Sequence, residues 1–464
     1  MKQNLSTFEA IISVVTSMFG IGIMFTPYSF SQSGPLVGGL ILLGVQVLTI
    51  ISMAGLLFCS KQYNKKLEEA MRKKLERTNN YLIGLGYTPT QEELERVEPI
   101  PDNQVVSYSR LVLQFNPFVS RVIEVLIPLG GIATCLFYQK YICVLATTLL
   151  GYNEKNEDFY YVYAEMIGLS SFYLYFLSQI EDLARLKYVS FISVLCMSTV
   201  GVFIMVLNFL MGNFIKQHSP NENKGDMAFV IGNFIFALFC QNNTVNLFTK
   251  LTDITSKSLL IISISSTIIS GTIYFTVGFM GSRLFGEHMV KKDIMSIFAD
   301  SKSPINVILD QEYSLYLLYI PKILCVLAIV VLSGSFPLQL SPVTVSLSSL
   351  GILSNFKRRT KTFIITTLLF ALIVGLNLIP NIGLDVVISL ISSLSCNFLA
   401  FLFPFGIVIY YFGKKHQYVV TTSLLIMLSS TIYAVFSVFS TFSGIINQDT
   451  PAMLSNETET IIQN

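Results

Sequence analysis

Long apolar runs recur along almost the whole chain, and they restrict the possible fold more than any other feature of the sequence. A helix of roughly 20 apolar residues spans a hydrocarbon core about 30 Å thick. The runs lack the alternation of polar and apolar residues that a membrane barrel needs, so helices must satisfy the backbone in lipid. With 52% apolar and 12% charged residues, the chain is too apolar for a soluble surface. The sequence therefore predicts an all-α integral membrane protein.

About eleven transmembrane helices are expected from these runs. The first run continues past Pro27 without a small-residue cleavage site, so we interpret it as a span and not as a signal peptide. The expected spans are residues 8–31, 35–59, 119–149, 160–180, 188–212, 227–248, 258–282, 314–352, 362–379, 384–412 and 418–446.

The distribution of lysine and arginine predicts the orientation of the chain. One set of alternating connections, which includes residues 61–77 and 357–361, carries most of the basic residues and is expected to be cytosolic. The N-terminus then lies in the cytosol. An odd number of spans places a polar tail, residues 448–464, on the outer or lumenal side. Residues 1–447 form one polytopic transporter domain in this prediction.

The longest polar segment, residues 60–104, connects the second and third spans. Its basic residues alternate with Glu68, Glu69 and Glu76, which favours a solvated cytosolic loop with short helices. A lipid-head-group or regulatory patch is the alternative interpretation.

Two of the apolar runs contain residues that weaken a membrane helix. The first reads "TSMFGIGIMFTPYSF" over residues 16–30, with two glycines and a proline. It is not a phosphate-binding GxGxxG loop, because Phe25 occupies the third glycine position and no strand precedes it. The sixth run reads "FVIGNFIFALFCQNNTVNLF" and places Gln241, Asn242 and Asn243 in lipid, where unpaired amides cost several kcal/mol. Glycines that only permit close helix packing are the alternative for the first run.

Interruptions in the first and sixth helices are what an inverted repeat of five plus five helices produces. Broken helices expose backbone N–H and carbonyl groups near the bilayer midplane, where they can bind the carboxylate and amine of a zwitterion. Glycine lets a ligand approach the bare backbone. The predicted substrate-binding residues at the two breaks are Gly20, Ile21, Gly22, Ile23, Cys240, Gln241 and Asn242.

Four segments in order also resemble one known family. "TSMFGIGIMFTPYSFSQSGPLVG" resembles the first helix of the amino acid/auxin permease family, and "FCQNNTVNLFTKLTDITSKSL" its sixth helix and the following loop. "VVLSGSFPLQLSPV" is similar to the Phe-Pro signature of its eighth helix, and "NLIPNIGLDVVISLISSLSCNFLAFLFPFGIVIYY" resembles its ninth and tenth helices. The resemblance is strongest to vacuolar and to sodium-coupled neutral amino acid transporters. It implies a leucine-transporter-like fold and amino acid transport.

The sequence departs from the sodium-coupled members of that family at two positions. Those members commonly have an asparagine four residues before the GxG motif, where this chain has Thr16. They also have a threonine ahead of the Phe-Pro pair, where this chain has Val330, Val331 and Leu332 before Ser333-Gly334-Ser335. A hard cation needs several oxygen ligands, although Thr16, Ser333 and Ser335 could supply some. The departures favour proton coupling or uncoupled exchange, with sodium coupling as the alternative.

Further candidates lie within the spans. Lys140 and Glu165 are expensive in lipid and are candidates for ion coupling, but as neighbours on adjacent helices they could equally pair or snorkel. Tyr138 lies in the third span, which lines the site in this fold, and its hydroxyl could reach a substrate carboxylate. Phe236 and Phe239 could gate the site. Packing or a lipid-facing position is the alternative for all three aromatic residues.

Other functional classes have little support. The seven cysteines fall in or at the ends of apolar runs and the three histidines lie far apart, so no metal, cofactor or catalytic triad is expected. The net charge of +2 does not suggest nucleic acid, and no ATP-binding motif is present. The prediction is a secondary active amino acid transporter for neutral or small polar substrates, in a vacuolar, lysosomal or plasma membrane, with no obligate protein partner. An amino acid sensor that signals through residues 60–104 is the alternative.

Overall fold

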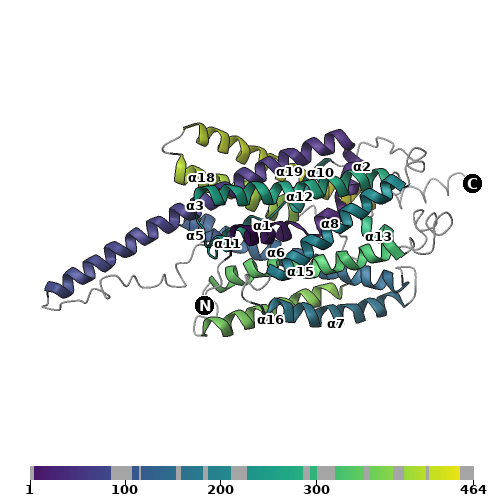
Figure 1. Ribbon diagram of the computed structural model, residues 1–464, viewed down its shortest axis with the longest axis horizontal. Coiled ribbons are helices and arrows are strands. Elements are labelled where there is room, and N and C mark those ends of the chain that lie inside the picture. Colours follow the sequence, from purple (N-terminus) through teal and green to yellow (C-terminus); the bar gives the residue numbers. More distant parts are fainter. Residues whose placement is uncertain are drawn as a thin grey trace, which may run out of the picture.

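We describe a computed structural model of the chain in which helices account for nearly all regular structure (Figure 1). It describes residues 5–84, 107–113, 116–152, 158–180, 187–210, 227–285, 293–299, 319–349, 356–379, 391–413 and 417–449. The predicted tail, apart from its first two residues, and residues 85–104 of the predicted loop lie outside these ranges. The helices are α1 (Thr7–Met18), η1 (Ile21–Phe25), α2 (Thr26–Ser33), α3 (Pro35–Gly84), α5 (Tyr108–Leu113), α6 (Pro117–Leu149), α7 (Phe159–Ser178), α8 (Lys187–Leu210), α10 (Met227–Ala237), α11 (Gln241–Phe248), α12 (Ser256–Phe285), α13 (Ile294–Ala299), α15 (Tyr319–Ser349), α16 (Arg358–Asn377), η4 (Ile391–Cys396), η5 (Phe398–Leu402), α18 (Phe403–Phe412) and α19 (Gln417–Asp449).

Membrane-spanning helices dominate the described residues, in number close to the prediction. Nine helices are long and apolar enough to cross a membrane, and a bent pair made of Thr7–Met18 and Ile21–Ser33 brings the number to ten. The remaining expected span, residues 160–180, corresponds to the 20-residue helix α7. Helix α7 contains several tyrosines and Glu165, and it is not among the helices counted as apolar enough to cross a membrane. The all-helical membrane class is therefore confirmed.

The first span is broken where the glycines predict it. Ser6 and Glu9 form a reciprocal capping box at the start of α1, and the helix ends at Met18. Gly20 adopts an extended conformation, after which the 3-10 turn η1 leads into α2 with Pro27 in its first turn. The two halves of the span meet at an angle of 53°. The predicted interruption of helix 1 is confirmed.

The sixth span is also interrupted, and it lies at the centre of the bundle. Helix α10 ends at Ala237 and α11 begins at Gln241, with residues 238–240 outside regular helix. Of its most apolar stretch 89% is buried, against 17% for the peripheral helix α19. Helices α10 and α11 contact η1, α1, α2 and α3 around them. Both broken helices therefore lie together inside the protein.

Helix α3 extends much further than the sequence predicts. We expected the second span to end near residue 59, but α3 continues to Gly84, 50 residues in all. Its second half projects from the bundle as one straight helix (Figure 1). Residues 60–84 therefore prolong the span and do not form separate short helices, because the end of apolarity is not the end of helix propensity.

A short helix covers the bundle at the opposite end from this projection (Figure 1). Helix α13 lies in the connection between α12 and α15, and it packs against α6, α15 and η1. Five of its six residues are buried, which includes Ile294, Met295 and Phe298. The connection therefore folds back onto the first broken helix.

Candidate functional site

The two helix breaks touch each other through backbone atoms. A Cβ atom on Gly22 would lie 2.8 Å from Cα and 2.9 Å from Cβ of Ala237, the last residue of α10. Real Cβ atoms do not approach so closely, so only glycine permits this contact. On the other side of the break, the hydroxyl of Tyr138 from α6 occupies the space that a side chain on Gly20 would need. The structure thus brings Gly20, Gly22 and Tyr138 together.

A tyrosine on α12 joins the two broken ends. The hydroxyl of Tyr274 forms a hydrogen bond with the carbonyl of Met18 at the end of α1 and lies 2.8 Å from the carbonyl oxygen of Ala237 at the end of α10. Tyr274 is completely buried and its ring makes an edge contact with Phe19. The last carbonyls of a helix lack partners within it. The single O–H of Tyr274 is therefore shared between one buried carbonyl from each broken helix.

Side chains of α15 satisfy the other carbonyls at the end of α1. The Ser335 hydroxyl lies 2.6 Å from the carbonyl oxygen of Phe19 and 3.2 Å from that of Thr16. The side-chain amide of Gln339 donates to the carbonyl of Ser17 at 3.1 Å. The hydroxyl of Thr16 itself points elsewhere, 2.9 Å from the carbonyl oxygens of both Ile12 and Ser190. Two ion-coupling candidates, Thr16 and Ser335, therefore meet at this turn.

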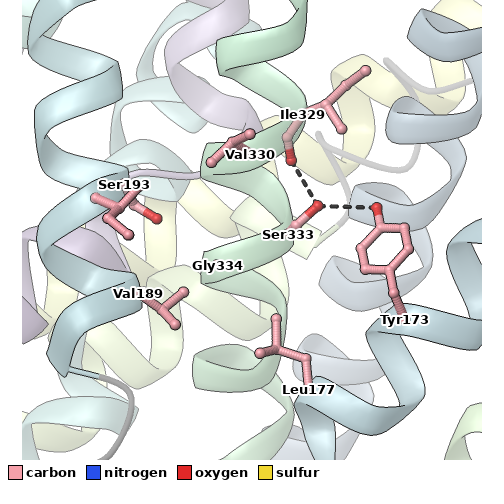
Figure 2. Close-up of a pocket in the computed structure, with 9 residues that line it drawn as sticks. Tyr173, Leu177, Val189, Ser193, Ile329, Val330, Ser333 and Gly334 are labelled. Atoms are coloured by element: carbon pink, nitrogen blue, oxygen red, sulfur yellow. Dashed lines mark hydrogen bonds between the residues drawn. The ribbon is translucent and has the colours of Figure 1, made fainter.

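Ser333 faces a different part of the protein. Its hydroxyl lies 3.0 Å from that of Tyr173 on α7 and donates to the carbonyl of Ile329 at 2.7 Å (Figure 2). It lines an open, mainly apolar cavity of about 390 Å³ between α7, α8 and α15, which Gly334 and Ser193 also line. Figure 2 shows Ser333 and Ser193 on opposite sides of α15. The structure does not bring Ser333 together with Thr16.

The N-terminal ends of the second halves of the broken helices carry N–H groups without acceptors inside their own helices. In η1 the first regular hydrogen bond is from Ile23 to Gly20, which leaves the N–H groups of Ile21 and Gly22. In α11 the first such hydrogen bond is from the N–H of Thr244 to the carbonyl of Cys240. The earlier N–H groups of α11 therefore have no acceptor within the helix. Such ends attract anionic groups.

At the break in the sixth span, side chains provide partners for only some of the polar groups. The side-chain oxygen of Gln241 accepts from the N–H of Cys240 at 3.0 Å, and its amide lies 3.5 Å from Ser52 on α3. The side-chain oxygens of Asn242 and Asn243 are buried and have no hydrogen-bond partner among the described residues. These two oxygens are therefore free acceptors in the first turn of α11.

The remaining sequence candidates are spread around this site. Phe236 is buried in the last turn of α10 and Phe239 is half-buried in the break itself. Lys140 is half-buried on α6, two residues after Tyr138, whereas Glu165 is exposed on the neighbouring helix α7. The two ion-coupling candidates thus differ in exposure.

Two residues of the site were missed by the sequence analysis. Gln339 is an amide within an apolar span, so the signal that singled out Gln241 could have found it. Tyr274 carries no such signal, because one of 22 tyrosines in an apolar run does not reveal a buried hydroxyl. Its role depends on α12 crossing both breaks, which only the fold shows.

Comparison with known sequences gives a match over nearly the whole chain. The family model described as "Transmembrane amino acid transporter protein" matches residues 3–83 and 94–448. No curated protein matches the chain in sequence.

Solved structures share the fold at low sequence identity. The structure of MhsT in complex with L-phenylalanine is 12% identical, with a TM-score of 0.54, and the match covers 95% of this chain and 100% of that one. The manganese transporter of Eremococcus coleocola, in complex with an aromatic bis-isothiourea substituted compound, is 13% identical with a TM-score of 0.56. That match covers 98% of this chain and 90% of the other. The predicted leucine-transporter-like fold is thereby confirmed.

Proposed function

This chain belongs to the transmembrane amino acid transporter family, and from that membership we propose that it moves neutral or small polar amino acids by alternating access, in symport with protons. The contact between the two helix breaks at Gly22 and Ala237 carries the proposal. In this scheme the helix group that contains both breaks moves against the remaining helices around a fixed substrate site.

The polar groups at the breaks suit an amino acid. The open N–H groups of Ile21 and Gly22 can bind a carboxylate, and the free side-chain oxygens of Asn242 and Asn243 can accept from an ammonium group. Among the described residues, the other polar side chains at the breaks are neutral: Tyr138, Gln241, Tyr274, Ser335 and Gln339. A charged substrate side chain would be buried there without an opposite charge, which disfavours cationic and anionic amino acids. MhsT, which has the same fold, was solved with L-phenylalanine.

The oxygen atoms at the end of α1 favour protons over sodium. A hard cation needs about six oxygen ligands. The carbonyls of Thr16 and Phe19 and the hydroxyl of Ser335 converge there, but the hydroxyl of Ser333 turns toward Tyr173. Three oxygens hold a cation weakly, so we propose that the driving ion is the proton. The acidic lumen of a vacuole or lysosome would supply its gradient.

We expect Ser335→Ala and Ser333→Ala to differ strongly in transport. Ser335→Ala leaves the buried carbonyls of Phe19 and Thr16 without their donor, which costs about 1–3 kcal/mol and should slow uptake about tenfold. Ser333→Ala removes a hydroxyl at the side cavity and should keep uptake within about twofold of wild type. Initial uptake rates in proteoliposomes check this, and equal rates for both variants would contradict it.

Uptake of labelled neutral amino acids into proteoliposomes, under separately imposed pH and sodium gradients, tests the proposed function. We expect accumulation with the pH gradient alone and no further gain from sodium. A strict sodium requirement would overturn proton coupling but not transport. Absence of flux for every amino acid, with folded protein, would overturn the transport proposal itself.

A further inference from the structure

One carboxyl group is buried at the covered end of the bundle, directly before α13. Asp293 is 7% exposed. Its Oδ1 accepts hydrogen bonds from the hydroxyl of Tyr141 and, at 2.9 Å, from the N–H of Ser296. Its Oδ2 accepts from the Ser296 hydroxyl at 2.6 Å. Asp293 therefore joins the connection between α12 and α15 to helix α6.

This link leads to the helix break through one turn of α6. Tyr138 and Tyr141 are three residues apart and lie on the same face of that helix. The hydroxyl of Tyr138 fills the space beside Gly20, while that of Tyr141 bonds to Asp293. Helix α13 itself packs against η1. The state of the Asp293 carboxyl can thus affect how closely α13 covers the proposed substrate site.

Few other ionisable groups approach Asp293 among the described residues. Tyr141 faces it from α6, and Cys325 faces the same region from α15, with its sulfur 3.4 Å from the carbonyl oxygen of Met295. Arg283 on α12 and Lys322 on α15 are exposed. The segment η1 has no ionisable side chain. Among the residues that the structure describes, burial and its own hydrogen bonds therefore govern the protonation of Asp293.

These two influences oppose each other. Burial raises the pKa of Asp293 above the ordinary value for aspartate, while the donors from Ser296 and Tyr141 partly offset the rise. A carboxyl with a raised pKa takes up a proton at less acidic pH than an exposed one. The protonated carboxyl carries one O–H, which is a donor. Its oxygens therefore cannot accept the three hydrogen bonds that the carboxylate accepts from Tyr141 and Ser296.

We propose that Asp293 is a proton-binding site that controls the cover formed by α13: the ionised form holds α13 against α6 through Tyr141, and protonation releases it so that the substrate site opens. A hydronium ion transfers its proton to a carboxylate oxygen of Asp293 and leaves as water, and the Tyr141 hydroxyl loses that acceptor. No other covalent bond is made or broken. The inference rests on the proposed transport function, because it assumes that the breaks bind the substrate, but it does not require the proton to be the driving ion.

The test is the pH profile of amino acid exchange without any gradient. Proteoliposomes loaded with alanine, serine and glutamine exchange with the same labelled amino acids at equal pH on both sides. Wild-type exchange should rise about tenfold as pH falls through the pKa of Asp293, which is the effect of one charge-assisted hydrogen bond. Asp293→Asn, which keeps the shape of the neutral form, should be fast at every pH and have a flat profile.

Two further variants separate this role from a structural one. Tyr141→Phe removes the hydroxyl through which the carboxylate holds α13, so its exchange should be fast at every pH, as in Asp293→Asn. Asp158→Asn is the matched control, because Asp158 is exposed and precedes α7 without a side-chain capping bond. It should keep the wild-type profile.

The outcomes distinguish the two proposals. A wild-type profile in Asp293→Asn would overturn the inference and leave the transport function intact. The same holds if folded Asp293→Asn protein is inactive at every pH, because the neutral amide should mimic the released state. Absence of exchange in wild-type protein at every pH would overturn the proposed function and the inference with it.

Discussion

Gly22→Val is expected to abolish transport, with uptake at least about tenfold below wild type and no comparable loss in expression. The Cβ of valine would lie 2.8 Å from the Cα of Ala237. Backbone cannot move aside as a flexible side chain can, so the two broken helices must separate. Their separation would dismantle the group of N–H donors that we propose binds the carboxylate.

Gly44→Val is the matched control for this substitution. Gly44 lies on an exposed part of α3, and a Cβ atom added there meets no other atom within 4 Å. Its uptake should stay close to wild type. Both variants are compared by initial uptake rate, with size-exclusion profiles to show that each protein is folded. Wild-type uptake in Gly22→Val would show that the contact between the breaks is dispensable.

Tyr274→Phe should have the second-largest effect. The substitution keeps the ring that packs against Phe19 but removes the hydroxyl between the carbonyls of Met18 and Ala237. A buried carbonyl left without a donor costs about 1–3 kcal/mol, so uptake should fall about tenfold or more. The cause is specific to the breaks, because both carbonyls belong to helix ends that have no other partner for them within the helix.

A second tyrosine offers a control for loss of a hydroxyl. Tyr175 on α7 bonds through its hydroxyl to Thr367 on α16 at 3.0 Å, away from both breaks. Tyr175→Phe should change uptake by less than about twofold. If the two variants lost activity equally, the effect of Tyr274→Phe would reflect general stability and not the helix breaks.

The broken helices could be predicted from the sequence because their physical penalty is visible there. Gly20 and Gly22 in the first span, and the amides at residues 241–243 in the sixth, are unfavourable in a lipid-facing helix unless the backbone has another use. The sequence also contained the information that Ser333 and Ser335 face different directions. Residues two apart on a helix point about 200° apart, so only one of them could face α1.

Other parts of the site depend on contacts that no local pattern encodes. Asp293 lies in a polar connection, and nothing near it indicates that this connection folds back onto α6 and η1. The space that a side chain on Gly22 would need is occupied by Ala237, a contact that the sequence analysis did not predict. Sequence spacing identifies where a helix must break, whereas the partner of the break is set by tertiary packing.

Helix α3 is long enough for its projecting end to move further than its buried part when the helix tilts. At 1.5 Å per residue, 50 residues extend about 75 Å, more than twice the thickness of the hydrocarbon core. Within the bundle α3 contacts both α10 and α11, the two halves of the sixth span. If rearrangement at that break tilted α3 by about 5°, a point about 40 Å beyond the bundle would swing by about 3.5 Å, by the geometry of a rigid rod. A spectroscopic probe near Gly84 would then register, magnified and in water, a movement of the buried helices.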